Sequence, residues 1–173
     1  VQGTAMLEGA HQARITTNEG ETTPVEFEHA IIATGSQPAA LPGMPQDDRI
    51  ITSRQALDLP DVPQRLLVVG AGYIGLELGQ VYAALGASVT VVEMMPEILP
   101  GTDRDLVRFL SRRLDRQFDS LLTRTRVQSM EVTDSGVQVR LEGDSSSEGS
   151  YDRVLVAVGR KPVTDGLGLD NTK

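Results

Sequence analysis

Cysteine and tryptophan are absent from this 173-residue chain, and histidine is scarce. Without cysteine, the chain cannot form disulfides, supply a sulfur nucleophile or bind a metal through thiolates. The two histidines, His11 and His29, lie far apart in the sequence, which argues against a histidine-based metal site. We therefore expect no metal, and we interpret both histidines as surface or strand-edge residues.

Long apolar runs and an excess of positive charge are also missing. No run approaches the roughly 20 residues that a membrane-spanning helix needs, and no signal-like segment opens the sequence. We therefore expect no membrane partner and a cytoplasmic location. The formal net charge is −8, whereas nucleic-acid binding requires clustered cations. Nucleic acid is therefore not an expected partner, and we interpret Arg112 and Arg113 as the solvated face of a helix.

The strongest pattern in the chain is the segment LLVVGAGYIGLELGQVYAALGASVTVVE, residues 66–93. Its first four residues are apolar and partly β-branched, as is typical of a buried parallel strand. Gly70, Gly72 and Gly75 follow at the G-x-G-x-x-G spacing. At this spacing the first glycine permits a tight turn, the second lets a pyrophosphate approach the backbone, and the third lets helix and strand pack closely.

The glycine turn leads into a predicted helix and then into a second strand, Ser88–Val92. The helix would bury one apolar face, made of Ile74, Leu78, Val81, Tyr82 and Leu85. Free amides and the positive dipole end at the start of the helix form an anion site. Glu93 follows the second strand, where a carboxylate can accept hydrogen bonds from both ribose hydroxyls of an adenosine. Two alternatives stay open: the glycines can serve packing alone, and Glu93 can be a solvated carboxylate.

Residues 1–36 predict a small β-rich region, and residues 37–60 predict a linker with a short helix. Four strands are predicted at Gln2–Leu7, Ala13–Thr17, Pro24–Phe27 and His29–Ala33. The linker is rich in proline and glycine, as is typical of a connection between structural units. Within it, Ser53 can cap a helix that reaches about Leu57. We expect the main domain to occupy residues 61–173.

After Glu93 the pattern continues with a helix from Thr102 or Asp103 to Phe118. Its apolar face would consist of Leu106, Phe109, Leu110 and Leu114. The elements predicted after it are a brief strand at Leu121–Leu122, a hairpin of Val127–Thr133 with Val137–Leu141, a polar loop over Gly143–Ser150, and a buried strand at Tyr151–Val158.

This order of elements indicates an α/β fold. We expect a Rossmann-like parallel sheet with helices on both faces and an antiparallel β-meander as one crossover, preceded by the small β-rich piece. Ligands of such sheets bind at the carboxyl ends of the strands. The glycine turn, Glu93 and Ala157–Arg160 all follow predicted strands, so we expect them to converge at one edge.

Several segments resemble the flavoprotein disulfide reductases, a family of pyridine nucleotide-disulfide oxidoreductases with two dinucleotide-binding domains. VVGAGYIGLELGQVYAALGASVTVVEMMPEILPGTDRDL resembles the NAD-binding motif of the family's dihydrolipoamide dehydrogenase group, and YDRVLVAVGRKP resembles the end of its NAD domain. HAIIATGS and VQGTA resemble pieces of the FAD-binding portion. The resemblance implies a partial FAD-domain segment in residues 1–36 and an NAD-binding domain in residues 61–173.

The resemblance also implies site residues, none of them catalytic. For NAD they are Gly70, Gly72, Tyr73, Ile74, Gly75, Glu77, Glu93, Val127, Ala157, Val158, Gly159 and Arg160. For FAD in the full-length protein they are Ala5, Thr34, Gly35 and Ser36. Without the resemblance, Glu77 would be interpreted as an exposed helix carboxylate.

The residues after Glu93 favour NAD over NADP. A 2′-phosphate needs a positive partner, usually arginine, and an acid that binds ribose would repel it. Glu93 is followed by Met94, Met95 and Pro96, and no basic residue occurs before Arg104.

The implied function is that of an NAD- and FAD-dependent oxidoreductase in which this chain positions the nicotinamide for hydride transfer from reduced flavin. The implied partners of the full-length protein are the lipoyl domains of 2-oxoacid dehydrogenase complexes and a second copy in a homodimer. Dithiol–disulfide exchange needs a thiolate, and the chain has no cysteine. We therefore expect the isolated chain to bind NAD or NADH without turnover.

Two other functions stay open. The first is an NADH-dependent relative in the same family, of the mercuric-reductase or NADH-oxidase kind. The second is a free-standing NAD(H)-sensing module. Residues outside these 173 positions distinguish them, because the cysteine pair and the His–Glu base of the family are not found here.

Overall fold

The chain forms two units in the structure, a computed structural model that describes residues 1–59, 61–144 and 146–172. The larger unit is Pro38–Arg160, and the smaller combines Val1–Gln37 with Lys161–Lys173. These boundaries differ from the expected ones at two places. Most of the expected linker belongs to the larger unit, and the residues after Arg160 belong to the smaller one.

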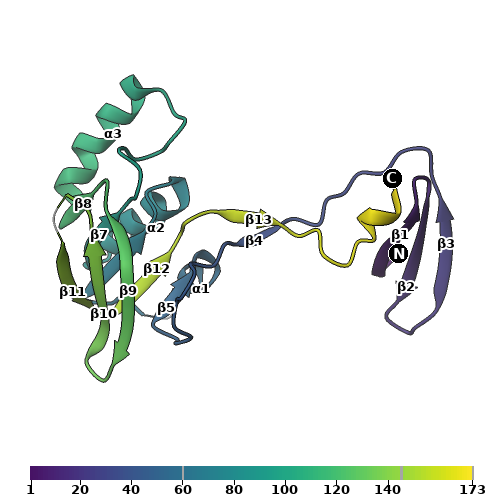
Figure 1. The fold of residues 1–173 in the computed structure, drawn as a ribbon, viewed down its shortest axis with the longest axis horizontal. Helices are drawn as coiled ribbons and strands as arrows, with labels where there is room; N and C mark the ends of the chain where they lie inside the picture. The colour runs from purple at the N-terminus through teal and green to yellow at the C-terminus, as the bar shows by residue number, and fades with distance from the viewer. Residues whose placement is uncertain (60, 145, 173) are drawn as a thin grey trace. The chain divides into compact units, whose positions relative to one another are not determined.

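A five-stranded parallel sheet forms the centre of the larger unit (Figure 1). Its strands, in spatial order, are β5 (Ile50–Thr52), β12 (Arg153–Val156), β6 (Arg65–Val69), β7 (Ser88–Val92) and β8 (Ser120–Leu122). The strands predicted at Leu66–Val69, Ser88–Val92 and Leu121–Leu122 are thus confirmed, whereas the predicted strand Tyr151–Val158 is shorter, because β12 covers only Arg153–Val156 and Tyr151 belongs to a different strand. The sheet also contains one strand that was not predicted, β5, which lies within the expected linker and pairs in parallel with β12. Ile50 and Ile51 are buried, so this edge strand contributes to the core.

Helices cover one face of the sheet. They are α1 (Ser53–Leu57), α2 (Tyr73–Ala84) and α3 (Arg104–Gln117). All three contribute to one apolar cluster with the sheet, through residues such as Ala56, Leu76 and Leu114. The Tyr82 hydroxyl is fully buried and donates a hydrogen bond of 3.0 Å to the Ala56 carbonyl, which ties α2 to α1.

A three-stranded antiparallel meander covers the opposite face, where we had also expected helices. Its strands are β9 (Arg126–Thr133), β10 (Gly136–Glu142) and β11 (Ser147–Tyr151). Val137, Val139 and Leu141 alternate along β10 and are buried against the sheet. The meander takes the place of a helical layer because this alternation gives it a continuous apolar face. The end of the serine-rich stretch, predicted as loop, pairs with β10 as β11.

The buried faces of the two long helices differ from those predicted. On α2, Val81 and Leu85 are 47% and 49% exposed, whereas Leu78 and Tyr82 are buried as expected. The exposed pair lies on the side of the helix that turns away from the sheet.

On α3, Leu106 and Phe109 are each 66% exposed, while Leu114 is fully buried. Val107 and Leu110 pack beside Leu114 against the core. Positions 107, 110 and 114 form an i, i+3, i+7 row, so the sequence offered two overlapping apolar stripes and the sheet contacts only one of them.

The smaller unit contains an antiparallel sheet of β1 (Gly3–Gly9), β2 (Gln12–Thr17) and β3 (Thr22–Glu26), which confirms three predicted strands. A 3₁₀ turn, η1 (Leu169–Thr172), joins it, and the Asn171 side chain donates to the Leu7 carbonyl. The predicted strand His29–Ala33 is wrong. Ile31 is 94% exposed, and no described strand pairs with this run. An apolar run becomes a strand only where a neighbour accepts its backbone hydrogen bonds.

The chain passes between the units in two short strands, β4 (Ser36–Pro38) and β13 (Arg160–Pro162), which pair with each other. Among the described residues, no helix has both the length and the apolar character that crossing a membrane requires.

Candidate functional site

The carboxyl ends of three central strands converge on the glycine turn, as predicted. Gly70, the first residue after β6, donates its backbone N–H to the Val92 carbonyl of β7 at 2.8 Å. On the other side, Ala157 donates its N–H to the Val69 carbonyl, also at 2.8 Å. The turn therefore lies between the ends of β7 and β12, at the edge where open α/β sheets bind ligands.

Two of the three glycines are required by the packing of the protein itself. Gly70 has a φ of 104°, and a Cβ there would lie 2.5 Å from the Ala157 carbonyl oxygen. At Gly75, a Cβ would lie 2.1 Å from the Gly70 carbonyl oxygen and 3.1 Å from a Val68 methyl group. No side chain fits at either place, so these glycines bring the first turn of α2 directly against the strand end.

Gly72 differs from the other two glycines. It is the N-cap residue of α2, with an extended backbone (φ −74°), and a Cβ at this position would meet nothing within 4 Å. Neither backbone strain nor internal packing requires a glycine here. The open space faces the start of a 12-residue helix, where the first amides have no partner within the helix. An anionic group that approaches the backbone closely would use this space, so the site fits a dinucleotide pyrophosphate.

Glu93 is not a solvated carboxylate. Its side chain is only 8% exposed, and one carboxylate oxygen accepts the Ala71 N–H at 2.8 Å while the other accepts the Met95 N–H at 2.9 Å. The acid thereby links the glycine turn to the loop after β7. Each carboxylate oxygen can accept more than one hydrogen bond, so both retain capacity for the hydroxyls of a ribose.

The loop after β7 is attached to the glycine turn a second time. Leu99 donates its N–H to the Ala71 carbonyl at 3.0 Å, and Leu99 itself has a positive φ of 49°. Ala71 therefore uses both of its backbone polar groups to hold Glu93 and the loop after β7. Sequence reasoning missed these contacts of Ala71, Met95 and Leu99, because a backbone amide carries no signature in the residue type.

The remaining NAD candidates of the strand ends lie near this edge. Thr125 donates its N–H to the Glu93 carbonyl at 2.9 Å, which places Val127 two residues beyond a direct neighbour of Glu93. Val127 is half-buried against the meander-side core. Ala157 adjoins Gly70, and Val158, Gly159 and Arg160 continue from it with exposed side chains or backbone.

The candidates on α2 are less constrained. Ile74 is half-buried, whereas Tyr73 is 65% exposed and Glu77 lies exposed one turn further along the helix. Within the described part of the chain, Glu77 forms no hydrogen bond or ion pair. The geometry leaves both side chains free to contact a ligand and assigns neither of them a structural role.

The FAD candidates lie in or beside the smaller unit. Thr34 donates its hydroxyl to the Val163 carbonyl, and Gly35 accepts the Val163 N–H at 3.0 Å. Ser36 begins β4. Ala5 is exposed on β1, opposite Ile15, and no described hydrogen bond links it to the other three candidates.

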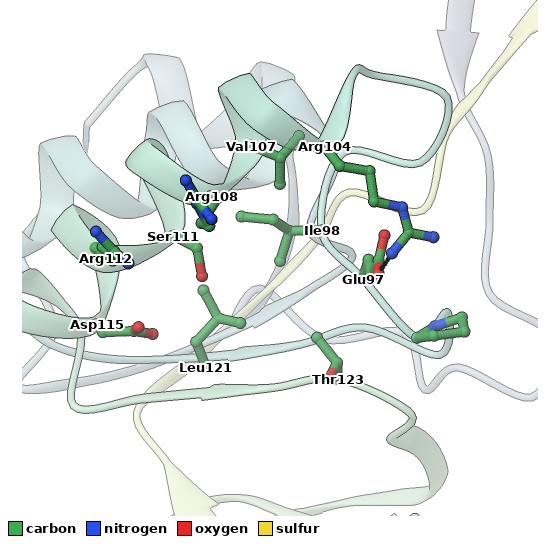
Figure 2. Close-up of a pocket in the computed structure, with 11 residues that line it drawn as sticks. Glu97, Ile98, Arg104, Val107, Arg108, Ser111, Arg112, Asp115, Leu121 and Thr123 are labelled. Carbon is green, nitrogen blue, oxygen red and sulfur yellow. Dashed lines mark ion pairs between the residues drawn. The ribbon is translucent and has the colours of Figure 1, made fainter.

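A cavity of about 510 Å³ lies apart from the glycine turn, between α3, the loop after β7 and β8 (Figure 2). None of the predicted site residues lines it. Three arginines of one helical face do so, Arg104, Arg108 and Arg112, together with the apolar residues Ile98, Val107 and Leu121. The four-residue spacing of the arginines was the available signal in the sequence. Among the described residues, no group of three or more metal-binding side chains is assembled.

Known proteins are similar to this chain over nearly its whole length. A family model described as pyridine nucleotide-disulphide oxidoreductase matches residues 1–173. Dihydrolipoyl dehydrogenase 3 of Pseudomonas aeruginosa is 43% identical over 98% of this chain and 37% of its own length. Leghemoglobin reductase of Glycine max is 40% identical over 98% of this chain and 33% of its own length.

Solved structures agree with the sequence matches. LpdA of Mycobacterium tuberculosis matches with a TM-score of 0.80 and 32% identity, covering 99% of this chain and 37% of that protein. The flavoprotein disulfide reductase RclA of Escherichia coli matches with a TM-score of 0.81 and 27% identity, covering 99% and 38% respectively. The chain thus spans little more than a third of the length of the relatives it matches.

Proposed function

The chain belongs to the pyridine nucleotide-disulphide oxidoreductase family, and from this premise we propose that it is the NAD(H)-binding part of an FAD-dependent dihydrolipoyl dehydrogenase. The observation that carries the proposal is the contrast among the three glycines. Gly70 and Gly75 are crowded by the protein itself, whereas Gly72 faces open space at the start of α2. Packing accounts for Gly70 and Gly75, and the close approach of a ligand would account for the glycine at position 72.

Different residues would bind different parts of the dinucleotide. The first amides of α2, next to Gly72, would bind the pyrophosphate through hydrogen bonds and the helix dipole. Glu93, held in place by Ala71 and Met95, would accept hydrogen bonds from the adenosine ribose. When bound, NAD supplies the hydride acceptor. The adenine and nicotinamide ends of NAD would be bordered by Val127, Glu77 and Ala157–Arg160. The chain would contribute to hydride transfer only by positioning the dinucleotide.

The burial of Glu93 supports NAD over NADP. A 2′-phosphate beside a carboxylate that is only 8% exposed would place two anions together where water screens them poorly. The next two residues, Met94 and Met95, carry no charge to offset this repulsion.

In the whole protein, Ala5 and Thr34–Ser36 would contact FAD, and lipoyl domains of 2-oxoacid dehydrogenase complexes and a homodimer partner would complete the assembly. We propose that the isolated chain has no turnover. It supplies no thiolate for reaction with a dithiol, because the sequence contains no cysteine.

Replacement of Gly72 tests the proposal directly. Gly72→Val should leave the fold intact, because a Cβ there meets nothing and the backbone is extended. The added side chain should block the pyrophosphate and weaken NADH binding roughly tenfold or more, a loss of about 1.4 kcal/mol. NADH binding is measured by titration of nicotinamide fluorescence, and folding by circular dichroism. Unchanged NADH affinity in a folded Gly72→Val variant would refute the site.

A second function is supported by two of the matches. RclA is described as an HOCl-induced flavoprotein disulfide reductase, and leghemoglobin reductase is also a relative, so another NADH-dependent reductase of this family is a candidate. Assay of the full-length protein with NAD and dihydrolipoamide separates the two functions, because only a dihydrolipoyl dehydrogenase would reduce NAD with that dithiol.

A further inference from the structure

One face of α3 and the edge strand β8 enclose the cavity shown in Figure 2, which we call the α3 groove. We propose that the α3 groove binds an extended acidic peptide segment whose carboxylates alternate with apolar residues. The proposal is independent of dinucleotide binding, since none of the residues assigned to NAD lines the groove.

Basic side chains outnumber acidic ones in the groove, although the chain as a whole has a net charge of −8. Arg104, Arg108 and Arg112 line it, against two acidic residues, Glu97 and Asp115. Arg104 forms an ion pair with Glu97 at one end. Within the described part of the chain, Arg108 and Arg112 form no ion pair, and the Arg108 guanidinium lies over the exposed Phe109 ring. Two cations are thus available to an anionic partner.

The floor of the groove is apolar. Ile98 is 4% exposed, and Val107 and Leu121 are half-buried beside it. Figure 2 shows Ile98 and Leu121 below the helix and Val107 projecting toward them from it, with the arginines spread along the helix. A partner that fills this groove therefore needs apolar side chains as well as carboxylates.

The spacing of the arginines matches an extended peptide. Positions four apart on a helix are separated by about 6 Å along its axis, because the rise is about 1.5 Å per residue. Alternate residues of an extended strand project to the same side at intervals of about 6.6 Å. Acidic residues at every second position would therefore meet Arg108 and Arg112 in succession.

The strand that bounds the groove is also suited to an extended partner. The five-stranded sheet ends at β8, which pairs with β7 on one side. Sheet edges in proteins accept an added strand through backbone hydrogen bonds, with side-chain pockets supplying specificity. The arginine row and the apolar floor would supply that specificity here.

Binding is tested with fluorescein-labelled ten-residue peptides by fluorescence anisotropy. One peptide alternates glutamate with valine, and the control alternates lysine with valine. The acidic peptide should bind the intact chain and the lysine peptide should not. Binding should weaken as salt rises, because exposed ion pairs are screened.

Two double variants of α3 locate the site. Arg108→Gln with Arg112→Gln should weaken binding of the acidic peptide roughly 2- to 30-fold, the range expected for the loss of two exposed ion pairs of about 0.2–1 kcal/mol each. Arg113→Gln with Arg116→Gln removes the same charge from residues that line a different hollow, so it should change affinity less than about twofold. Circular dichroism confirms that both variants fold.

Three outcomes would overturn the proposal. The first is no binding of the acidic peptide at low salt. The second is an equal loss in both double variants, which would indicate diffuse attraction to the helix. The third is displacement of the peptide by equimolar citrate or phosphate, which would show that the groove selects compact anions.

Discussion

The Glu93 carboxylate accepts two backbone N–H groups while its side chain is almost fully buried. Glu93→Ala should therefore have two separable effects. Loss of the acceptors for Ala71 and Met95 should lower the free energy of unfolding by about 1–3 kcal/mol. Loss of the ribose partner should narrow the preference for NADH over NADPH by on the order of 1–3 kcal/mol.

Urea denaturation measures the first effect, and parallel NADH and NADPH titrations measure the second. Glu97→Ala is the matched control, because Glu97 lies in the same loop but pairs with Arg104 at the surface. If Glu93→Ala kept both the stability and the nucleotide preference of the parent, Glu93 would have neither role.

Asp47 and Arg49 form a pair that joins the entry of β5 to the tip of the meander. The Arg49 guanidinium donates to Asp47 and, at 2.7 Å, to the Thr133 carbonyl. Hydrogen bonds from Arg49 lower the pKa of the Asp47 carboxyl from 3.8 to about 2. Since the folded state holds the carboxylate more strongly than the unfolded state does, its contribution is present above pH 3.8 and is lost as the pH falls toward 2.

Asp47→Asn should consequently be less stable than the parent at pH 7, and the difference should shrink steadily between pH 4 and pH 2. Thermal unfolding across this pH range measures it. Asp48→Asn is a control at the neighbouring position. A difference that stayed constant down to pH 2 would show that the carboxylate charge is not the cause.

A residue of the site could be predicted from the sequence where its position requires one particular residue type. Gly70, Gly75 and Glu93 lie where their spacing placed them, because only glycine tolerates the close approaches and only a carboxylate offers two acceptor oxygens. The partners of Glu93 could not be predicted, since every residue type except proline offers the same backbone amide. The open space at Gly72 emerges only from three-dimensional geometry.

At the scale of elements, α3 offers a direct comparison between two leucines. Leu114 is fully buried and Leu106 is 66% exposed, although both belong to the apolar face predicted from periodicity. Leu114→Ala should lower the free energy of unfolding by about 2–5 kcal/mol, through lost burial and the resulting cavity. Leu106→Ala should change it by less than about 0.5 kcal/mol.

Urea denaturation of the two variants measures the difference, and each serves as the control for the other. Similar losses in both would place Leu106 in the core and contradict the observed orientation of α3.

The elements that sequence reasoning missed or misplaced were decided by their neighbours. β5 has only three residues, and it is a strand because β12 lies beside it. β11 is polar and serine-rich, yet it pairs with β10. The apolar run His29–Ala33 has the better strand composition but no described strand beside it. Pairing is a property of the assembled sheet, so local composition does not determine it.

At the scale of the whole molecule, the order of elements predicted the parallel sheet and the meander well, because a strand–helix–strand pattern admits few topologies. The unit boundaries were harder to predict. The chain enters the larger unit through β4 and leaves it through β13, so the smaller unit is assembled from two separated stretches of sequence. The amino-acid composition along the chain does not indicate that two distant stretches form one unit.

The pairing at this crossing has a consequence for how the chain can fold. Ala39 donates its backbone N–H to the Gly159 carbonyl at 2.9 Å, so the two ends of the larger unit meet across one hydrogen bond. Once that unit has formed, its two ends lie side by side, and they bring the two stretches of the smaller unit together. The entropic cost of closing the long intervening loop then no longer opposes assembly of the smaller unit. Formation of the larger unit should therefore lower the entropic cost of assembling the smaller one.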